Sequence, residues 1–328
     1  MKLLIIGGAG YIGAHVVHDL VENGHHVIVY DNLSSGFKEN LPPNCTFILG
    51  DILEKEDLIS AINQEIDVVF HFAAKKAAGE SMVDARSFSQ TNITGTINIL
   101  DAMVECNVKN IIFSSTAAVY GEPEYLPIDE SHPTKPTNFY GFTKLTIERL
   151  IEWYSHIHDI SFSSLRYFNA VGYDLKERIF IAEKEPQNLF PIIMKVLLGD
   201  KETMNIFGND YDTPDGTCIR DYIHVNDLSL AHIKALSYLL EKKESLCVNL
   251  GTGKGYSVLE SIKSAESITG KKVRFNISEK REGDPQSLYA KSNLANDVLD
   301  WSPKYSSLES IMESMWMLYK KESKNAVR

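Results

Sequence analysis

A glycine-rich turn near the amino terminus constrains the fold of this chain more than any other sequence feature. The apolar run Leu3–Ile6 leads directly into Gly7-Gly8-Ala9-Gly10-Tyr11-Ile12-Gly13, and a helical pattern follows to about residue 23. Read from Gly7 the turn is GxxGxxG, and read from Gly8 it is GxGxxG. Glycines at this spacing let the chain turn tightly and let backbone N–H groups approach a pyrophosphate. The start of a helix adds about half a positive charge at the same point. The turn therefore predicts a dinucleotide-binding unit.

The first half of the chain alternates between strand-like and helix-like segments. Helical patterns near 11–23, 54–63, 84–107 and 140–157 separate most of six apolar runs, namely Leu3–Ile6, Val27–Tyr30, Thr46–Leu49, Val68–Phe72, Ile111–Ser114 and Phe162–Tyr167. These runs lack polar alternation, which is typical of strands buried on both faces. The β-α-β order predicts an α/β fold, a doubly wound parallel Rossmann sheet with right-handed crossovers.

The pattern loosens after Gly172. A charged stretch and a turn-rich stretch precede helical patterns at about 226–243, 257–269 and 306–321. The sequence contains no internal repeat and no flexible linker. We therefore expect residues 1–172, with a return segment near 218–250, to form a dinucleotide-binding domain. Residues 173–328 are expected to form a smaller substrate-binding lobe folded against it.

Acidic residues after the second and third predicted strands indicate which dinucleotide is bound. Asp31 ends the second strand about 20 residues after the turn, where a carboxylate bonds the hydroxyls of the adenosine ribose. It would repel a 2′-phosphate, and no arginine lies between residues 1 and 85. The expected cofactor is therefore NAD, not NADP. Asp51 follows the third strand, and a contact to the adenine and a helix cap are equally good interpretations of it.

Composition limits the partners and the compartment. The net charge of −11 argues against a nucleic-acid or anionic-membrane surface, although local arginines and a helix N-terminus can still hold phosphates. No stretch approaches the roughly 18 consecutive apolar residues that span a bilayer. Four well-separated cysteines without a CxxC pair favour reduced thiols in a cytoplasmic protein, and no metal site is expected.

Tyr140 and Lys144 form the candidate catalytic pair. Their spacing of four residues places both side chains on one face of a helix. A free tyrosine has a pKa of about 10 and is a poor base at neutral pH, but a neighbouring ammonium and a nicotinamide cation both favour the phenolate. The pair follows a strand that ends in Ser114-Ser115-Thr116. A hydroxyl at that strand end can bridge the tyrosine and a substrate hydroxyl.

Together these motifs resemble the extended short-chain dehydrogenases and, within them, the UDP-glucose 4-epimerases. The resemblance covers nearly the whole chain and is carried by GGAGYIG, DNLSSG, GDI, HFAAKKAAGES, FSSTAAVYGE, YGFTK, LRYFNAVG, QNLFP, IFGNDYDTPDGTCIRDYIHV, NLGTGKGYSV and REGD. The IFGNDYDTPDGTCIRDYIHV segment is the most discriminating, because other extended dehydrogenases match it poorly. The resemblance implies an isomerase that interconverts UDP-galactose and UDP-glucose through a 4-keto sugar, with transient reduction of bound NAD.

The resemblance also implies a role for each matching residue. Tyr140 is the expected acid–base, Lys144 its pKa modifier, and Thr116 the hydroxyl near the sugar's 4-position, where many family members have serine. Residues expected around the cofactor are Gly7, Gly10, Tyr11, Ile12, Gly13, Asp31, Asn32, Asp51, Ile52, Phe72, Lys76, Asn92, Tyr140, Lys144, Tyr167 and Phe168. Residues expected around the UDP-sugar are Lys76, Thr116, Tyr140, Asn169, Asn188, Leu189, Phe207, Arg220, Arg281, Asp284 and Leu288. Of the latter set, the two arginines pair with the diphosphate, Asp284 reaches a ribose and Phe207 flanks the uracil.

Two departures from the family pattern concern the lid and the specificity. The segment 174–187 (DLKERIFIAEKEPQ) does not match the usual family sequence, so a different lid is expected there. Leu288 stands where some family members carry a bulky tyrosine beside the sugar. The smaller side chain leaves room for an N-acetyl group at the sugar's 2-position, unless the adjacent Tyr289 fills that space.

Three alternatives share the fold and the cofactor. Related 4,6-dehydratases carry an Asp-Glu pair directly after the strand-end threonine, where this chain has Ala117-Ala118, and alanine cannot move a proton. A non-catalytic NAD-binding protein can keep the glycine turn and lose the catalytic pair, which is present here. Epimerases or decarboxylases of UDP-uronic acids or UDP-pentoses stay open, because a few pocket side chains decide between them.

The family usually forms homodimers through two helices, expected here at 84–107 and 140–157. Ile93, Ile97, Leu100 and Val104 form an apolar stripe on the first of these helices. The stripe fits a homodimer contact, and it fits packing on the sheet equally well.

Overall fold

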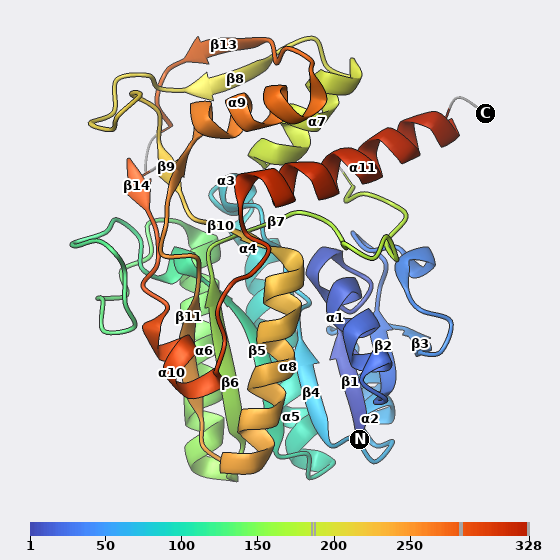
Figure 1. Cartoon of the computed structure of the whole chain (residues 1–328). Helices are drawn as coiled ribbons and strands as arrows, with labels where there is room; N and C mark the ends of the chain where they lie inside the picture. Colours follow the sequence, from blue (N-terminus) through green and yellow to red (C-terminus); the bar gives the residue numbers. More distant parts are fainter. Residues whose placement is uncertain (185, 187, 282–284, 327–328) are drawn as a thin grey trace.

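A seven-stranded parallel sheet forms the base of the molecule, and a smaller lobe lies beyond the ends of its strands (Figure 1). The structure is a computed structural model that describes residues 1–184, 186, 188–281 and 285–326. The strand order is β11-β6-β5-β4-β1-β2-β3. The strands are β1 (Lys2–Ile6), β2 (His26–Asp31), β3 (Thr46–Leu49), β4 (Val68–His71), β5 (Asn110–Thr116), β6 (Ser161–Tyr167) and β11 (Leu246–Leu250). All six predicted strands lie in this sheet, which confirms the doubly wound Rossmann fold.

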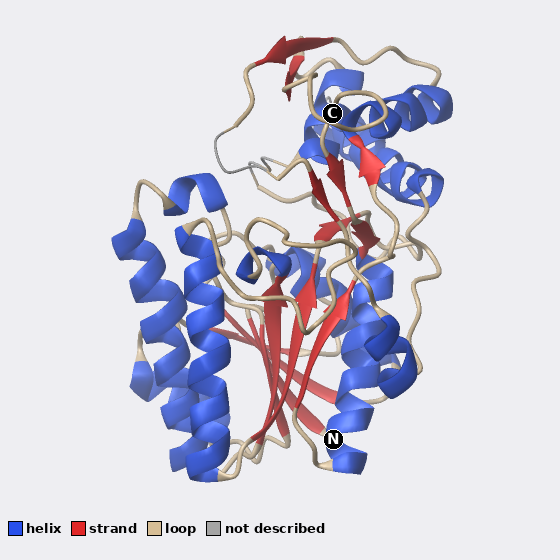
Figure 2. Cartoon of the chain, turned by 90° about the vertical axis from the view of Figure 1, so that its left-hand side faces the viewer, coloured by secondary structure: helices blue, strands red, loops and turns tan. Residues whose placement is uncertain are grey.

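Helices cover both faces of the sheet, so the strands are buried between two layers (Figure 2). One face is covered by α1 (Tyr11–Glu22), α8 (Val225–Lys242) and α10 (Asn293–Leu299), and the other by α2 (Lys55–Ile62), α5 (Gly95–Glu105) and α6 (Phe139–His158). Alternate residues of β1 enter opposite layers: Leu3 and Ile5 join the first, whereas Leu4 and Ile6 join the second. This burial on both faces explains why the strand sequences lack polar alternation.

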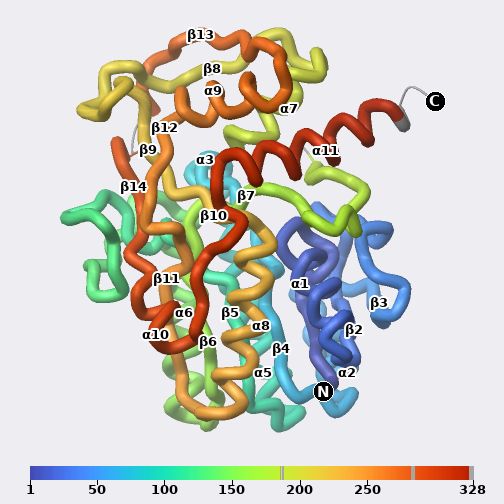
Figure 3. Tube along the Cα trace, in the orientation of Figure 1, coloured from blue at the N-terminus to red at the C-terminus, as the bar shows by residue number. Residues whose placement is uncertain are grey.

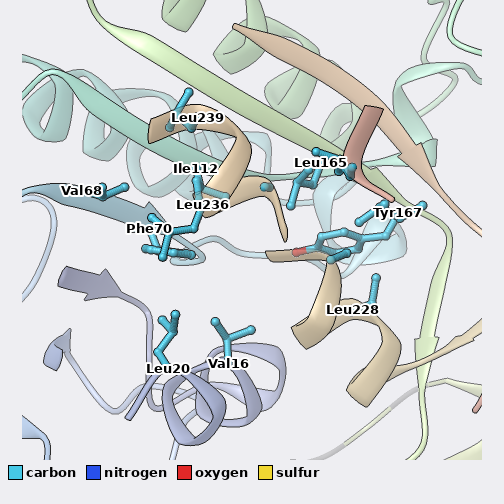
Figure 4. Packing of buried hydrophobic residues seen from close by; sticks show 14 of the residues in the cluster. Val16, Leu20, Val68, Phe70, Ile112, Leu165, Tyr167, Leu228, Leu236 and Leu239 are labelled. Atoms are coloured by element: carbon cyan, nitrogen blue, oxygen red, sulfur yellow. The ribbon is translucent and has the colours of Figure 1, made fainter. Parts of the chain in front are cut away.

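The layer between the sheet, α1 and α8 is the larger apolar core (Figure 4). Val16 and Leu20 of α1 lie on the same side of the sheet as Phe70 of β4 and Leu236 of α8. All four side chains are at most 2% exposed. Each buried side chain of this size contributes about 1.5–3 kcal/mol relative to an exposed one. This layer therefore stabilises the packing of α1 and α8 on the sheet.

The second lobe consists of helices packed on small sheets (Figure 1). Its helices α7 (Leu189–Leu198), α9 (Val258–Thr269) and α11 (Leu308–Ala326) surround a separate apolar core that includes Phe190 and Met312. Its strands are β8 (Met204–Phe207) paired with β13 (Phe275–Ser278), and β9 (Ile219–Arg220) between β12 (Tyr256–Ser257) and β14 (Ser287–Leu288). β7 (Asn169–Val171) and β10 (Tyr222–His224) pair in parallel and link this lobe to the sheet.

The helix predicted at 84–107 is interrupted. It forms α4 (Ala85–Phe88), a π-helical turn η2 (Ser89–Thr94) and then α5. Asn92 lies in the π turn, fully buried, where its side chain bonds the backbone of Lys75 and the hydroxyl of Thr143. Periodicity cannot predict such a turn, because it depends on these distant partners.

Short elements complete the described chain: η1 (Lys38–Asn40), α3 (Ala78–Ser81) and η3 (Ala117–Val119). None of the helices in the described ranges has the length and apolar character needed to cross a membrane.

Candidate active site

The glycine turn joins β1 to α1 at the carboxyl edge of the sheet, and its geometry fits a diphosphate. Gly7 has a φ of +81°, a left-handed conformation that other residues rarely adopt. A Cβ on Gly13 would lie 2.4 Å from the Gly7 carbonyl oxygen, so only glycine lets α1 approach this closely. Gly10 begins α1 without a side-chain cap, and Tyr11 and Ile12 form its first turn. With no capping side chain over them, the first N–H groups of α1 suit an anion.

Asp31 ends β2 beside this turn and is buried. Its Oδ2 accepts a hydrogen bond from the Ala9 N–H at 2.9 Å, and its Oδ1 accepts one from the Leu33 N–H at 2.8 Å. Burial raises the pKa of Asp31, and the two backbone N–H groups oppose that rise. A carboxylate oxygen accepts more than one bond, so Asp31 can hold the turn and still accept from ribose hydroxyls. This donor and acceptor set fits NAD.

Asp51, predicted either to contact the adenine or to cap a helix, follows β3 and is hydrogen-bonded to Asn32 and to Leu53. Asn32 Nδ2 donates to Asp51 Oδ2 at 2.9 Å, and the Leu53 N–H donates to Asp51 Oδ1 at 2.9 Å. Asp51 therefore stabilises a turn. It is not the N-cap of α2, because that position is Glu54. Ile52 is 5% exposed and packs below the turn in the core that contains α2 and α5.

The segment 173–184, which covers most of the departure from the family pattern, lies against the glycine turn and α1 (Figure 3). The Tyr11 hydroxyl donates to the Gly172 carbonyl at 2.5 Å. Asn40 Nδ2 donates to the Ile181 carbonyl at 2.8 Å, and the Ile181 N–H donates back to Asn40 Oδ1 at 3.0 Å. Lys76, expected beside cofactor and sugar, pairs with the Glu183 carboxylate of this segment. The segment thus encloses the turn from the side opposite the sheet.

The structure brings Tyr140, Lys144 and Thr116 together at the end of β5. Asn138 caps α6 by accepting from the Gly141 N–H at 2.8 Å, which places Tyr140 in the first turn. Lys144 Nζ donates to the Ser114 carbonyl at 2.7 Å, and the Thr116 side chain lies close enough to Tyr140 to lower the pKa of its phenol. The helix cap and the strand end therefore hold the three groups in one place.

Burial dominates the proton affinities of this pair. It lowers the pKa of Lys144 from 10.5 to about 7, and the Glu148 carboxylate one turn further along α6 opposes the fall. Burial raises the pKa of Tyr140 to about 12, and the Thr116 side chain acts in the opposite direction. The tyrosine is therefore a weak acid that needs a nearby positive charge to ionise at neutral pH.

Other residues predicted in the cofactor pocket lie at the same edge. Phe72 follows β4, and its N–H donates to the Ile6 carbonyl at 2.8 Å. The hydroxyl of Tyr167, at the end of β6, bonds Ser114 Oγ. Phe168 is 8% exposed and packs in a small apolar cluster with Ala117. With Asn92 in the π turn, these side chains line the ends of neighbouring parallel strands, where ligands of such sheets bind.

The residues predicted to hold UDP lie in the second lobe and at its junction with the sheet. The Arg281 guanidinium stacks on the Phe207 ring, 3.8 Å from its centroid, and both line a cavity of about 490 Å³ with Ile192 and Asn205. Asn188 precedes α7 as its N-cap and Leu189 is its first residue. Asp284 lies outside the described residues.

The remaining predicted residues flank the junction between the lobes. Arg220 and Leu288 are paired across β9 and β14. Asn169 Nδ2 donates to the Asp221 carbonyl at 3.0 Å. Leu288 packs against the small apolar cluster that contains Phe168.

Sequence reasoning missed three charged residues next to this site. Asp221 is fully buried and accepts bonds from the N–H groups of Thr252, Gly253 and Ala290, which joins β9 to the turn after β11 and to the end of β14. Glu148 and Arg166 form a buried ion pair beneath Lys144. Two sequence features could have indicated this ion pair. Arg166 is a charged residue inside the buried strand SFSSLRY, and Glu148 follows Lys144 at the same spacing of four residues that separates Tyr140 from Lys144.

The position of the dehydratase acid–base pair holds no acid or base. η3 follows Thr116 directly and begins with Ala117, which is 4% exposed. The Ala118 N–H donates to Thr116 Oγ1 at 3.2 Å, which holds the threonine hydroxyl at the mouth of the site. Within the described ranges, no group of three or more His, Cys, Asp or Glu residues is placed to hold a metal ion.

Comparison with known proteins agrees with this site. A family model described as GDP-mannose 4,6 dehydratase matches residues 4–315. A UDP-glucose 4-epimerase of Halalkalibacterium halodurans is 46% identical over 98% of this chain and 96% of its own length. The crystal structure of a UDP-glucose 4-epimerase from Brucella ovis in complex with NAD has a TM-score of 0.94 at 38% identity, covering 97% of this chain and 98% of that chain. A UDP-glucose 4-epimerase from Bifidobacterium longum in complex with NAD+ and UDP has a TM-score of 0.93 at 35% identity, covering 98% and 99%.

The name of the family model and the names of the relatives differ in the reaction they state. Dehydration requires an acid and a base, and the Asp-Glu pair expected of a 4,6-dehydratase directly after Thr116 is replaced here by Ala117-Ala118. The relatives named as epimerases match over nearly their full length. The chain therefore belongs to the nucleotide-sugar family that the GDP-mannose 4,6 dehydratase model describes and, within it, to the UDP-glucose 4-epimerases.

Proposed function

We propose that the chain interconverts UDP-galactose and UDP-glucose by oxidising the sugar at carbon 4 and reducing it again on the opposite face. The observation that carries this function is the meeting of Tyr140, Lys144 and Thr116 at the sheet edge that also holds the glycine turn and Asp31. Bound NAD supplies the chemistry of accepting a hydride from carbon 4 and returning it.

The side chains of this chain move and hold the proton. Tyr140 takes the proton of the 4-hydroxyl and returns it to the 4-keto sugar after the sugar has turned over. The Lys144 ammonium lowers the cost of the phenolate, and Thr116 orients the hydroxyl by bonding both it and Tyr140. Ser114 supports this arrangement because its carbonyl holds Lys144 Nζ.

The UDP group anchors the sugar while it turns. Asn169, Asn188, Leu189, Phe207, Arg220, Arg281 and Asp284 are the residues that we propose to hold it, with the two arginines on the diphosphate. The cavity that Phe207 and Arg281 line has the volume of a ligand pocket, which supports the assignment of these two residues. In the same proposal residues 1–172, with 218–250, hold NAD and residues 173–328 hold the UDP-sugar.

We further propose that N-acetylated substrates are accepted. The Tyr289 ring lies against Gly255, and a Cβ built on Gly255 would be 3.4 Å from that ring. Leu288 packs on the opposite side, against the apolar cluster of Phe168 and Ala117. Tyr289 therefore points away from the space that a tyrosine at position 288 would fill, which supports room for a 2-acetamido group.

A homodimer contact through α6 is also part of the proposal. Phe142, Trp153 and Ile157 recur on one face of α6 at helical spacing and are 48%, 65% and 65% exposed. Large apolar side chains exposed along one helix face are typical of a protein–protein contact. In the predicted stripe, Leu100 is fully buried against the sheet, whereas Ile93, Ile97 and Val104 are partly exposed and can add to this surface.

Four free cysteines support the proposal of a cytoplasmic location.

Two alternative functions are distinguished by experiment: an epimerase or decarboxylase of UDP-uronic acids or UDP-pentoses, and a protein that binds NAD without turnover. Both share the glycine turn and differ in the product formed.

The purified protein is to be incubated separately with UDP-galactose, UDP-N-acetylgalactosamine and UDP-galacturonate, without added NAD, and the products resolved by chromatography. We expect the matching gluco-epimers of the first two sugars. Tyr140→Phe is to abolish conversion, whereas Tyr154→Phe, which removes a hydroxyl from the same helix, is the matched control. Conversion of the uronic acid alone, or no conversion by a folded protein with NAD added, would contradict the proposal.

A further inference from the structure

A buried ion pair lies directly beneath the catalytic lysine. Arg166 of β6 bonds the Glu148 carboxylate of α6 in a bidentate manner, with Nε–Oε1 at 2.9 Å and Nη2–Oε2 at 2.6 Å. The two side chains are 10% and 4% exposed. Ser115 Oγ donates a further bond to Glu148 Oε1 at 2.5 Å. Arg166 Nη1 donates to the Tyr120 hydroxyl at 3.0 Å. The carboxylate is therefore fixed by donors from two neighbouring strands.

The end of β5 holds α6 through three consecutive residues. The Ser114 carbonyl accepts from Lys144 Nζ, Ser115 Oγ donates to Glu148, and the Thr116 side chain lies near the Tyr140 phenol and lowers its pKa. The three partners on α6 follow one another at intervals of four residues and so share one face of the helix. Glu148 thus belongs to the same helix–strand seam as the catalytic pair, although it lies too deep to reach a sugar.

Stability alone does not explain this ion pair. Replacing a buried ion pair by apolar side chains of similar volume is often neutral or stabilising, because two charges must be desolvated to form it. Glu148 faces a group whose charge matters for the reaction, and among the described residues it is the carboxylate that acts on Lys144. This makes a role in the chemistry the better explanation.

The groups that face this seam come from each element packed on it. His71 of β4 faces Lys144, and burial together with Lys144 lowers the pKa of His71 to about 3, so it is neutral. Tyr167 of β6 faces Tyr140. Arg166 interacts electrostatically with Tyr120 and with Cys247 of β11, and Cys247 does so with Glu148, Glu152 and Glu130.

We propose that Glu148 is a positioning residue for the reaction: clamped by Arg166 and tied to Ser115, it sets α6 on the end of β5, and its carboxylate favours the ammonium form of Lys144. This inference rests on the proposed epimerase function. Loss of the carboxylate displaces Tyr140 and Lys144 from the sugar and lowers the pKa of Lys144, so that the ammonium is lost at a lower pH.

The test compares Glu148→Gln and Glu148→Asp with the wild-type holoenzyme. For Glu148→Gln we expect kcat for UDP-galactose to fall about 10- to 100-fold with KM within about twofold, because the reacting groups are misplaced while UDP binding is kept. The alkaline limb of the kcat profile is expected to move to lower pH by about one unit. Glu148→Asp keeps the charge and is expected to restore the position of that limb in part.

Three further variants separate positioning from folding. Ser115→Ala removes only the tether to β5 and is expected to lower kcat in the same direction, by a smaller factor. The double variant Glu148→Met, Arg166→Met removes both charges without leaving either unpaired, and it is expected to fold and still turn over slowly. Asp227→Asn is the matched control, because Asp227 is a fully buried, hydrogen-bonded carboxylate in another part of the fold.

Titration of Lys144 by NMR provides a readout that needs no turnover. Protein labelled with 13C at lysine Cε is titrated, and the Lys144 signal is assigned by its absence in Lys144→Met. We expect a lower pKa of Lys144 in Glu148→Gln and an unchanged one in Asp227→Asn. An unchanged Lys144 titration, or a Glu148→Gln enzyme with the wild-type kcat and pH profile per folded molecule, would overturn the positioning role. If the wild type converts no UDP-sugar, the proposed function fails while the NMR titration still decides the role of Glu148.

Discussion

Replacing Lys144 by methionine should make the protein more stable and the enzyme slower. Lys144 is 2% exposed, and burial lowers its pKa from 10.5 to about 7. Holding its ammonium in the folded state therefore costs about 5 kcal/mol at about 1.4 kcal/mol for each pKa unit. Methionine has a similar shape without the charge. It leaves the Glu148–Arg166 pair intact, so no buried charge loses its partner.

The pH dependence of this cost has a defined sign. Because the pKa of Lys144 is lower in the folded state than in the unfolded state, the unfolded chain binds more protons between about pH 7 and pH 10.5. The free energy of unfolding of the wild type therefore increases as the pH rises through that window. The methionine variant lacks this increase. The advantage of the variant should therefore shrink by about 3 kcal/mol between pH 6.5 and pH 9.5.

Loss of the Ser114 contact reduces the stabilisation expected for Lys144→Met but does not change how that stabilisation depends on pH. The carbonyl of Ser114 loses the donor that Lys144 Nζ provides, at a cost of about 1–3 kcal/mol. We expect a net stabilisation of about 2–4 kcal/mol at pH 6.5. Urea unfolding at pH 6.5 and pH 9.5, followed by tryptophan fluorescence, measures both numbers. A difference between wild type and variant that stays the same at both pH values would refute the role of the buried ammonium.

The catalytic effect should go the other way. In the folded protein the Tyr140 phenol, with a pKa of about 12, is ionised in about one molecule in 10⁴ at pH 8, so proton transfer depends on any charge that favours the phenolate. We expect kcat of Lys144→Met to fall about 100-fold or more, which lies in the range of general acid–base catalysis. A variant that is both destabilised at pH 6.5 and fully active would contradict the reasoning on both counts.

Three further predictions concern the cofactor, the sugar and the assembly. Asp31→Asn weakens the bonds to Ala9 N and Leu33 N and those offered to a ribose, so the Kd for NAD measured by calorimetry on stripped enzyme should rise about 10- to 100-fold; an unchanged Kd would show that Asp31 only shapes the turn. Leu288→Tyr should lower kcat/KM for UDP-N-acetylgalactosamine about 10-fold or more relative to UDP-galactose, and equal losses for both sugars would argue against the 2-acetamido space. Trp153→Glu places a charge on the exposed α6 face and should convert a dimer to a monomer in sedimentation velocity, and a mass unaffected by the variant would place any contact elsewhere.

Local sequence patterns predicted the elements that carry the cofactor site. The glycine turn, Asp31 at the end of the next strand, and the six apolar runs each reflect interactions among residues close in the chain. Strand burial on both faces appears directly as an absence of polar alternation, and a spacing of four places Tyr140 and Lys144 on one helix face. The resemblance to the epimerases added roles for the residues of the second lobe, which spacing alone does not suggest.

Contacts between distant segments were outside the reach of such patterns. The π turn around Asn92 depends on the backbone of Lys75 and on Thr143, which lies 51 residues further along the chain. Segment 174–187 was expected to differ from its relatives, but the contact of Ile181 with Asn40 and the pairing of Glu183 with Lys76 appear only in the fold.

The sequence by itself therefore determined the Rossmann sheet and the preference for NAD, and it predicted Tyr140 and Lys144 as the acid–base pair. The tertiary structure decided how the pair is held and how its protons are tuned. The pKa of Lys144 results from burial by several elements and from Glu148, and Glu148 is in turn fixed by Ser115 and Arg166 on two different strands. Burial and charge are properties of the whole surroundings of a group, so they exist only once segments far apart in the sequence have packed together.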